Sequence, residues 1–422
     1  MESFDRVALI VLADFVNGYA FKPEDITEQG LPIIRIEQLK DSNAPFDFYH
    51  GKVPPENYIE NDDLIFSWSA SLFLQIWTRG RAVLNQHLFK VIPKPNVDKL
   101  FLKYCIEFNL PVLTKSAHGS TMQHITRREL ERFFVSIPKK KDVQSKIAEV
   151  LSTVDRAIEQ TEVQIAKYHR IKTGLMHDLL TRGIDDHGQL RDPATHKFKN
   201  SPLGFIPDEW ESVTLGEIVA KSGGTIQTGP FGSQLHAYEY TSEGIAVIMP
   251  QDIKNDGHLD LNGAAKISEN RANDLRRHRL KPNDVIFARR GDLSRCAAIH
   301  TENDGICGSG CLLVRIPNEV LLGDWLSAIY KHDKCQRQIA MRAVGSTMVN
   351  LNTGLVAALL LPKLNIQEQK AIVNSFRFIT ELCQVEEAVY QNLTKLKTGL
   401  MQDLLTGKVS VEPLLEPQNE DR

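Results

Sequence analysis

The feature of this 422-residue chain that most constrains its fold is a short segment that occurs twice. It reads KTGLMHDLLTRG from Lys172 and KTGLMQDLLTGK from Lys397, and nine of the first ten positions are identical. The match continues upstream more weakly at the same offset of 225 residues, where Gln144 aligns with Gln369. A repeat with so long a period indicates tandem duplication of a large unit, not a solenoid of short repeats.

Other matching segments occur in the same order in both halves. They are GSTM at 119–122 and 345–348, LPIIRIEQLKDS at 31–42 with IAVIMPQDIKND at 245–256, and NDDLIF at 61–66 with PNDVIF at 282–287. In both halves, short apolar runs such as LIFSW and IAVIMP stand between Gly, Asn, Asp and Pro residues. This pattern is typical of strands and turns, and helical patches at 98–108 and 323–341 interrupt it.

Each mixed region is followed by one long helix. Its apolar residues recur at steps that average about 3.5, the spacing of a coiled-coil seam. The predicted seam consists of Leu151, Val154, Ile158, Ile165, Leu175 and Leu179 in the first helix and Ile372, Phe376, Ile379, Leu393, Leu400 and Leu404 in the second. Pro138 and Pro362 precede the helices, and Gly183 and Gly407 follow them. About 38 residues give rods of roughly 55–60 Å, and so narrow a seam requires a partner helix, which the other copy can supply.

These patterns predict an α+β protein built as a tandem repeat, in which each of two mixed α/β domains is followed by one long helix. The predicted boundaries are a first domain at 1–138, a first spacer helix at 139–184, a linker at 185–200, a second domain at 201–362, a second spacer helix at 363–408 and a C-terminal tail at 409–422.

Composition excludes some classes of protein and leaves others open. The net charge of −3 and pI near 6.5 do not by themselves indicate a nucleic-acid binder. Six scattered cysteines suit the reduced thiols of a cytosolic protein. No run of about 18 apolar residues is present, and the start MESFDRVALIVLADF makes a poor signal peptide. We therefore expect a cytoplasmic protein with no membrane partner.

The chain shows no convincing catalytic or metal site. NAPF at 43–46 is similar to an amino-methyltransferase loop but has Ala44 where proline belongs, and too few residues precede it for a cofactor-binding fold. The glycines of 305–313 precede an apolar strand, whereas a phosphate-binding loop follows one. Cys307 and Cys311 lack a second pair at zinc-site spacing, so two buried thiols are the favoured interpretation.

Several stretches together resemble the specificity (S) subunit of a Type I restriction-modification system. They are ADFVNGYAFK at 13–22, IFSWSASL at 65–72, RAVLNQHLFKV at 81–91, SPLGFIPDEWESVTLGEI at 201–218 and DVIFARRGDLSR at 284–295, with the two GSTM and KTGLM segments. One departure is Asp292, where many members of that family have a small neutral residue. An acidic group there could repel phosphate or accept a hydrogen bond from a cytosine amino group.

The resemblance implies a non-catalytic subunit that binds double-stranded DNA. It also implies that the two mixed α/β domains are separated by two long antiparallel helices, a coiled coil, in a pseudo-two-fold tandem repeat. Each of two target-recognition domains would read one half of an asymmetric bipartite sequence. Two methyltransferase (M) subunits would dock around the helices, and restriction (R) subunits would join the larger complex. No cofactor is expected on this chain, whereas S-adenosylmethionine is expected on the M subunits and ATP with Mg on the R subunits.

Candidate DNA-reading residues lie in loops beside the predicted strands. In the first domain they are Ser67, Trp68, Ser69, Arg79, Arg81, Gln86, His87, His118, Ser120, Thr121 and Gln123. In the second they are Gln227, Thr228, Ser233, Gln251, Arg289, Arg290, Ser294, Arg295, Ser346 and Thr347. Arg and Gln can make bidentate contacts to guanine and adenine, while Ser and Thr mostly hold phosphates. Trp68 and His87 also fit a role in the core, and the repeated GSTM favours a structural or phosphate-holding role.

Two other functions remain open from the residues alone. The acidic pI is compatible with a protein-only scaffold whose helices dock partners without direct DNA reading. A cryptic enzyme is the third alternative, which the search for catalytic motifs does not favour.

Overall fold

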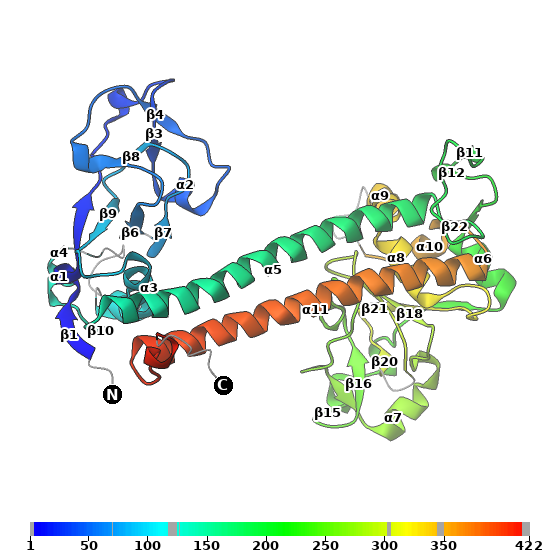
Figure 1. Ribbon diagram of the computed structural model, residues 1–422. Coiled ribbons are helices and arrows are strands. Elements are labelled where there is room, and N and C mark those ends of the chain that lie inside the picture. Colours follow the sequence, from blue (N-terminus) through cyan, green and yellow to red (C-terminus); the bar gives the residue numbers. More distant parts are fainter. Residues whose placement is uncertain are drawn as a thin grey trace, which may run out of the picture. The chain divides into compact units, whose positions relative to one another are not determined.

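The computed structural model describes residues 4–69, 71–116, 125, 127–301, 305–343 and 350–415 (Figure 1). The chain divides into two compact units. The first unit comprises Met1–Gln164 and Glu386–Arg422, and the second comprises Ile165–Val385. Each unit therefore contains one mixed domain together with part of both long helices.

The domain of the first unit holds a strand pair, two four-stranded sheets and short helices. Its elements are β1 (Phe4–Ala8), α1 (Leu9–Leu12), β2 (Ala13–Asn17), η1 (Pro23–Asp25), β3 (Leu31–Ile34), α2 (Ile36–Lys40), β4 (Asp47–Tyr49), η2 (Pro55–Asn57), β5 (Tyr58–Ile59), β6 (Leu64–Ser67), β7 (Phe73–Ile76), β8 (Ala82–Leu84), β9 (Leu88–Pro93), α3 (Lys99–Ser116), α4 (Arg127–Arg132) and β10 (Phe134–Pro138).

The second unit opens with a hairpin and then repeats the arrangement. Its elements are β11 (Phe198–Ser201), β12 (Gly204–Pro207), β13 (Glu211–Thr214), α6 (Leu215–Ser222), β14 (Thr225–Thr228), η3 (Gly232–Gln234), η4 (Ala237–Glu239), β15 (Tyr240–Thr241), β16 (Ile245–Ile248), η5 (Pro250–Asp252), β17 (Lys266–Ile267), α7 (Glu269–Asp274), η6 (Arg276–His278), β18 (Val285–Ala288), β19 (Cys296–Ala298), β20 (Ile306–Cys307), β21 (Cys311–Arg315), α8 (Gly323–Lys331), α9 (Asp333–Ala343), α10 (Thr353–Ala357) and β22 (Leu360–Lys363). The long helices are α5 (Lys141–Thr181) and α11 (Ile366–Leu405), and η7 (Glu412–Leu414) follows α11.

The two domains share one strand topology. The sheet order β2-β9-β6-β7 in the first domain corresponds to β14-β21-β18-β19 in the second, with all neighbours antiparallel. Each domain has a second four-stranded sheet, β4-β3-β8-β5 or β15-β17-β16-β20. In each of these sheets one pair of strands is parallel, β3 with β8 and β16 with β20. Each domain is closed by an antiparallel pair of its outer strands, β1 with β10 and β13 with β22. The tandem repeat predicted from the sequence is thus a repeat of folds.

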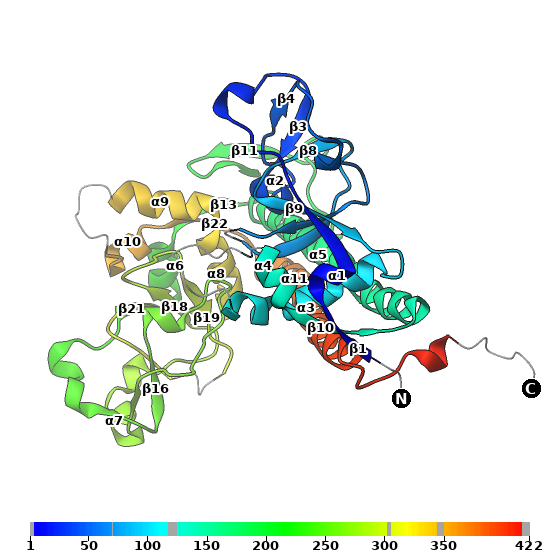
Figure 2. The ribbon, with the colours of Figure 1, turned by 90° about the vertical axis from the view of Figure 1, so that its left-hand side faces the viewer.

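The central strands β6 and β18 are buried on both faces, which explains why their sequences are almost continuous apolar runs. In β18, Val285 and Phe287 pack toward the helices, whereas Ile286 packs against the second sheet, as strand alternation requires. In β6, Leu64 and Phe66 face the helix side and Ile65 the second sheet in the same way. Figure 2 shows the second sheet of the second unit, marked by β16 and α7, on the side of β18 and β21 away from α8.

An unusual backbone conformation recurs at the same place in both domains. Asp62 (φ 76°) and Asn283 (φ 73°) adopt the left-handed conformation immediately before the aspartates that lead into β6 and β18. Asp and Asn tolerate this region better than other side chains. The Oδ2 atom of Asp63 accepts the backbone N–H of Glu60 at 2.7 Å, and Asp284 repeats this turn with Lys281 at 2.8 Å.

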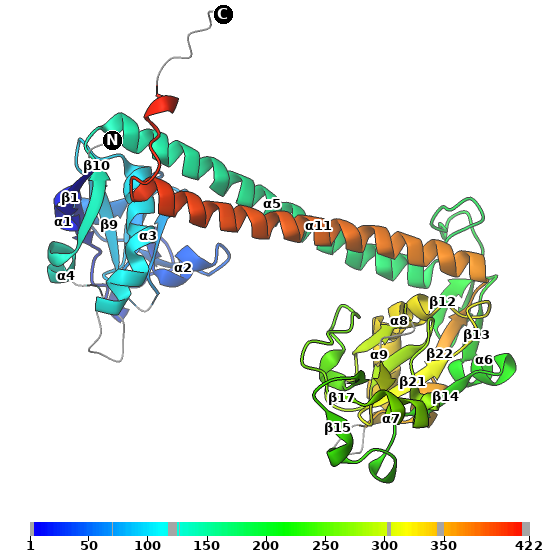
Figure 3. The same ribbon diagram turned by 90° about the horizontal axis from the view of Figure 1, so that it is seen from below.

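The long helices pack side by side within each unit (Figure 3). In the first unit the beginning of α5 lies beside the end of α11, because Asp155 and Lys397 form an ion pair at 2.6 Å. In the second unit the end of α5 shares a core with the beginning of α11, where Leu179 and Ile372 belong to one cluster. The helices are therefore antiparallel, as predicted.

The predicted seam lies inside the helix packing. Leu151, Leu179, Ile372, Ile379 and Leu404 are buried, while Val154, Ile158, Ile165, Leu175, Phe376, Leu393 and Leu400 are half-buried. Both helices end on a glycine in the left-handed conformation, Gly183 (φ 67°) and Gly407 (φ 71°), two positions beyond the last helical residue.

The segment expected as a linker is folded onto α11. Arg191, inside 185–200, is buried and donates to the carboxylate of Glu368, and β11 begins at Phe198 within the same range. A buried ion pair of this kind cannot be recognised from local composition, which here is polar and rich in turn formers.

Candidate nucleic-acid interface

In the first domain, the end of β6 carries three of the predicted DNA-reading residues. Ser67 is fully buried and donates its hydroxyl to the carbonyl of Ser71 at 2.5 Å, and Ser69 is also buried. Trp68 is half-buried, with its ring centroid 5.4 Å from that of Phe89 and 6.2 Å from that of His87. The two serines serve the interior of the domain, whereas Trp68 lies between core and surface.

The turn between β8 and β9 brings two predicted side chains to the surface, since Gln86 and His87 are both exposed. Because the His87 ring lies near that of Trp68, tilted by 44°, residues that follow β6 and β8 are neighbours at this end of the domain. His118, Ser120, Thr121 and Gln123 lie outside the described residues, as do Ser346 and Thr347 of the second domain.

The two predicted arginines of the first domain have different roles. The guanidinium of Arg79 lies 4.5 Å from the centroid of the Trp77 ring and donates to the backbone carbonyls of Gln38 and Ser42. Arg79 therefore joins α2 and the following loop to the end of β7. Arg81 is exposed, 4.8 Å from the Tyr58 ring centroid and 3.4 Å from Glu60, and an exposed pair of this kind is easily exchanged for another anion.

In the second domain, Arg289 follows β18 directly, as Trp68 follows β6. Its guanidinium lies 5.1 Å from the centroid of the Phe231 ring. Within the described part of the chain, its buried Nε and Nη1 atoms have no hydrogen-bond partner. Unpaired buried donors are costly, which sets this side chain apart from the other predicted residues of the second domain. Arg290 beside it is exposed.

Asp292 uses its carboxylate within its own loop. One oxygen accepts the backbone N–H of Ser294 at 3.0 Å and its hydroxyl at 2.6 Å, and the other accepts Nε of Arg295 at 3.3 Å. The Ser294 hydroxyl bond, assisted by the Arg295 charge, holds the pKa of Asp292 below its usual value. The acidic residue that departs from the family pattern thus orders Ser294 and Arg295 instead of standing free.

The remaining predicted residues of the second domain are of two kinds: some are engaged within the domain, and others are exposed. Gln227 donates to the backbone carbonyl of Arg277 at 2.5 Å and Thr228 is half-buried, so both are engaged in the domain. Ser233 and Gln251 are exposed. Gln251 and Arg295, together with Lys254, line an open hollow of about 380 Å³.

The sequence interpretation missed the aromatic residues of this face. Phe231 and Tyr238 are exposed, Tyr238 to 82%, and the His236 and Tyr238 rings stack with centroids 5.2 Å apart. The signal was available, because aromatic residues in a polar, glycine-containing loop are unusual unless they pack or bind. Lys254 was also missed, since a single lysine in a turn carries no pattern.

The outer surface of the helix pair carries apolar side chains that lie outside the seam. Those exposed are Val163 and Ile171 on α5 and Phe378, Val385, Val389 and Leu396 on α11. Gly174 and Gly399, inside the two KTGLM segments, are exposed, and a methyl group added to either would touch nothing within 4 Å. Exposed apolar patches on soluble chains are typical of protein-protein contact surfaces.

Within the described ranges, no group of three or more His, Cys, Asp or Glu residues is placed to hold a metal. Cys307 and Cys311 are buried free thiols, and burial raises the pKa of both. A search of the same residues found no helix long and apolar enough to span a bilayer.

Comparison with known proteins shows which proteins this chain is similar to. Residues 3–167 match the model of the Type I restriction modification DNA specificity domain. The chain is 23% identical over 425 residues to the Type I restriction enzyme MjaVIII specificity subunit of Methanocaldococcus jannaschii, covering 98% of this chain and 94% of that relative. It is 24% identical over 313 residues to the EcoBI specificity subunit of Escherichia coli, covering 71% of this chain and 63% of that relative.

Solved structures agree on the fold. An S subunit of a Type I restriction-modification system from M. genitalium matches with a TM-score of 0.60 at 16% identity, covering 96% of both chains. A chain from a study of type I R-M complex assembly matches with a TM-score of 0.55 at 15% identity, covering 96% of this chain and 98% of that one. The chain is therefore similar to Type I restriction-modification specificity subunits, in sequence over 98% of its length and in fold over 96%.

Proposed function

We propose that this chain gives a Type I restriction-modification complex its DNA sequence specificity by binding an asymmetric bipartite duplex target. One observation carries the proposal. The loop that follows the central strand holds Trp68 and Ser69 in the first domain but Arg289 and Arg290 in the second, on the same strand topology. Equivalent loops with different donors and aromatic groups are expected to read different half-sites, because base edges are distinguished by hydrogen-bond pattern.

The surface chemistry around Arg289 supports DNA reading over a protein-only scaffold. A guanidinium with unpaired donors is suited to bidentate contact with guanine. Exposed aromatic rings such as Phe231 and Tyr238 can pack against sugars or bases. Nearby cations, among them Arg290, can hold phosphates and position the domain.

The helix pair would hold the partners. We propose that two M subunits dock on the exposed apolar residues of α5 and α11 and on the two KTGLM segments, and that R subunits join the full complex. The same short segment would occur twice because two copies of one partner make equivalent contacts. S-adenosylmethionine would be carried by the M subunits and ATP with Mg by the R subunits.

Domain exchange tests the proposal directly. The chain is reconstituted with its M subunits, and adenine methylation is mapped genome-wide. We expect a two-part motif with a fixed gap, and replacing residues 1–138 by another first domain should change one half of the motif only. Change of both halves, or of neither, would contradict the assignment of one half-site to each domain. Binding that lacks sequence selectivity and salt dependence would favour the protein-only scaffold.

A further inference from the structure

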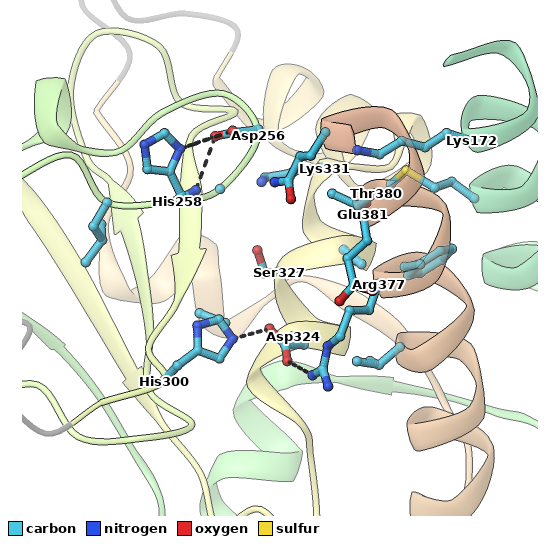
Figure 4. Close-up of a pocket in the computed structure, with 18 of the residues that line it drawn as sticks. Lys172, Asp256, His258, His300, Asp324, Ser327, Lys331, Arg377, Thr380 and Glu381 are labelled. Atoms are coloured by element: carbon cyan, nitrogen blue, oxygen red, sulfur yellow. Dashed lines mark hydrogen bonds and ion pairs between the residues drawn. The ribbon is translucent and has the colours of Figure 1, made fainter. Parts of the chain in front are cut away.

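The second unit contains a cavity of about 570 Å³ beside the helix pair. Figure 4 shows it between α5, α8 and α11 and the loop that carries Asp256 and His258. Its apolar lining includes Met176 and Phe376, and Lys172 and Lys331 are among its charged groups. The volume falls in the range of sites that bind small molecules or anchoring side chains.

In the first unit, Tyr104 is buried beside the two long helices. The Tyr104 hydroxyl donates to Asp155 at 2.6 Å, and the Nζ of Lys397 lies 2.6 Å from the other carboxylate oxygen. The same Nζ lies 5.6 Å from the centroid of the Tyr104 ring. A phenol, a carboxylate and a lysine thus connect α3, α5 and α11.

The repeat shows which residues take these places in the second unit. Gln144 and Gln369 are equivalent, and each accepts the backbone N–H that precedes a helix, that of Asp98 before α3 and that of Leu322 before α8, both at 2.9 Å. Asp98 and Leu322 therefore occupy equivalent positions. Six residues after Asp98 lies Tyr104 in α3, and six residues after Leu322 lies Ala328 in α8.

The repeat offset of 225 residues identifies the second-unit positions that correspond to Lys397 and Asp155. Lys397 corresponds to Lys172, and Asp155 corresponds to Thr380, with Glu381 next to it. Ala328, Lys172, Thr380 and Glu381 all line the cavity. The second unit has therefore kept the lysine of the three-residue arrangement and lost the aromatic ring.

The charges around the cavity leave this lysine available. Asp324 is engaged by His300 at 2.8 Å and by Arg377 at 3.6 Å, and Asp256 by His258 at 2.9 Å. Among the described residues, Lys172 and Glu381 form no ion pair. A lysine over an aromatic face is attracted to the electrons of the ring, and a carboxylate is a strong acceptor for a phenol hydroxyl.

We propose that this cavity receives a tyrosine side chain from the M subunit, which takes the place that Tyr104 occupies in the first unit. This inference rests on the proposed function for the identity of the partner. The ring would lie against Ala328 and Met176 and beneath Lys172, and its hydroxyl would donate to Glu381. The two ends of the helix pair would then differ: the first is closed by its own tyrosine, and the second is closed on assembly.

The chemistry of the cavity can be tested on the full chain alone. Methionine methyl groups are labelled with ¹³C, and N-acetyl-tyrosinamide is titrated while the Met176 signal is followed by NMR. We expect a saturable ring-current shift with this probe and none with N-acetyl-leucinamide. Ala328→Tyr, which fills the space from within, should abolish the response, and Lys172→Gln should weaken it at least threefold. No shift in the parent chain, or an equal shift in Ala328→Tyr, would overturn the proposal.

The partner is tested by titrating the M subunit into each variant and measuring the dissociation constant. We expect Ala328→Tyr to weaken binding at least tenfold, whereas the control Ala194→Tyr, at an exposed position away from the cavity, leaves it unchanged. Normal binding by Ala328→Tyr would refute the M-subunit tyrosine even if the free probe binds. If the M subunit fails to bind the parent chain, the proposed function fails, while the NMR titration still reports on the cavity.

Discussion

Arg191 and Glu368 form a buried ion pair that joins the segment after α5 to the start of α11. The side chains are 7% and 5% exposed. Glu368 also accepts the backbone N–H of Ile184 at 3.0 Å and the indole N–H of Trp210 at 3.1 Å. One carboxylate therefore holds the end of one long helix, the beginning of the other and the entry to the second domain.

Replacing Glu368 by Gln should lower the free energy of unfolding of the second unit by about 3–5 kcal/mol, because the buried Arg191 charge would keep only the exposed carboxylate of Glu209, 3.8 Å away. Hydrogen exchange of residues 182–212 measures the loss locally. The matched control is Glu211→Gln, whose partner Lys363 lies 3.1 Å away with both side chains more than half exposed. Equal protection in both variants would show that the buried pair is not the stabilising contact.

Tyr104→Phe removes the hydroxyl bond to Asp155 and keeps the ring. Hydrogen bonds to charged groups contribute about 1.5–3 kcal/mol, so the first unit should lose roughly that much stability in urea titrations. Tyr390→Phe is the control, because no side-chain hydrogen bond of this half-buried tyrosine occurs among the described residues. Equal midpoints for the two variants would contradict the importance of the Tyr104–Asp155 contact.

Acid should destabilise the second unit through His278. Burial, aided by the Arg277 charge, lowers the pKa of His278 from its usual 6.5 to about 4. The unfolded chain therefore binds the proton more readily, so the stabilisation is complete above pH 6.5 and is lost as the pH falls toward 4, by about 3 kcal/mol. His332, whose pKa burial also lowers, acts in the same direction.

Urea titrations of the second unit between pH 7 and pH 4 measure this slope. His278→Gln should flatten it, since glutamine does not titrate. A slope that is unchanged in His278→Gln would assign the acid sensitivity to other groups.

Each reading loop should affect its own half-site. Arg289→Gln should weaken target binding by about 1–3 kcal/mol, roughly 5- to 150-fold, and relax selectivity in the second half-site only. Trp68→Ala should act on the first half-site only. Competition with duplexes altered in one half-site at a time distinguishes them, and Lys221→Gln controls for the loss of a positive charge. Loss of selectivity at both half-sites from one variant would contradict separate reading.

Alanine in place of either glycine of the KTGLM segments should raise the stability of the free chain but lower its affinity for the M subunit. Gly174→Ala and Gly399→Ala should each stabilise the free chain by about 0.5–1 kcal/mol, because alanine favours the helix and meets open space. In the proposed complex the added methyl group should weaken M-subunit binding. Gly183→Ala is the contrasting change and should destabilise, since its φ is 67° and the methyl group would meet the Glu368 carboxylate. Unchanged M-subunit affinity would show that the two glycines do not lie in that contact.

The sequence was sufficient to predict the repeat and the two long helices, because the repeat follows from matching segments at one offset and each helix from the periodicity of its apolar residues. The antiparallel arrangement followed from the family resemblance. The sequence did not reveal the partners of side chains that meet across long separations. Arg191 and Glu368 are 177 positions apart, and the position of Arg289 over Phe231 depends on how two loops fold. Ser67 was predicted to lie in a DNA-reading loop, yet it is the last residue of β6 and is buried.

The shared helices also have a consequence for how the protein is made. The hydrophobic core of the first unit includes Leu404, Leu405 and Val411, and the ring of Phe4 lies against Gly407. The ribosome releases these late residues only after the entire second domain has been synthesised. The first half of the nascent chain must therefore remain with an incomplete core until translation ends, which makes it the stretch most in need of protection by chaperones.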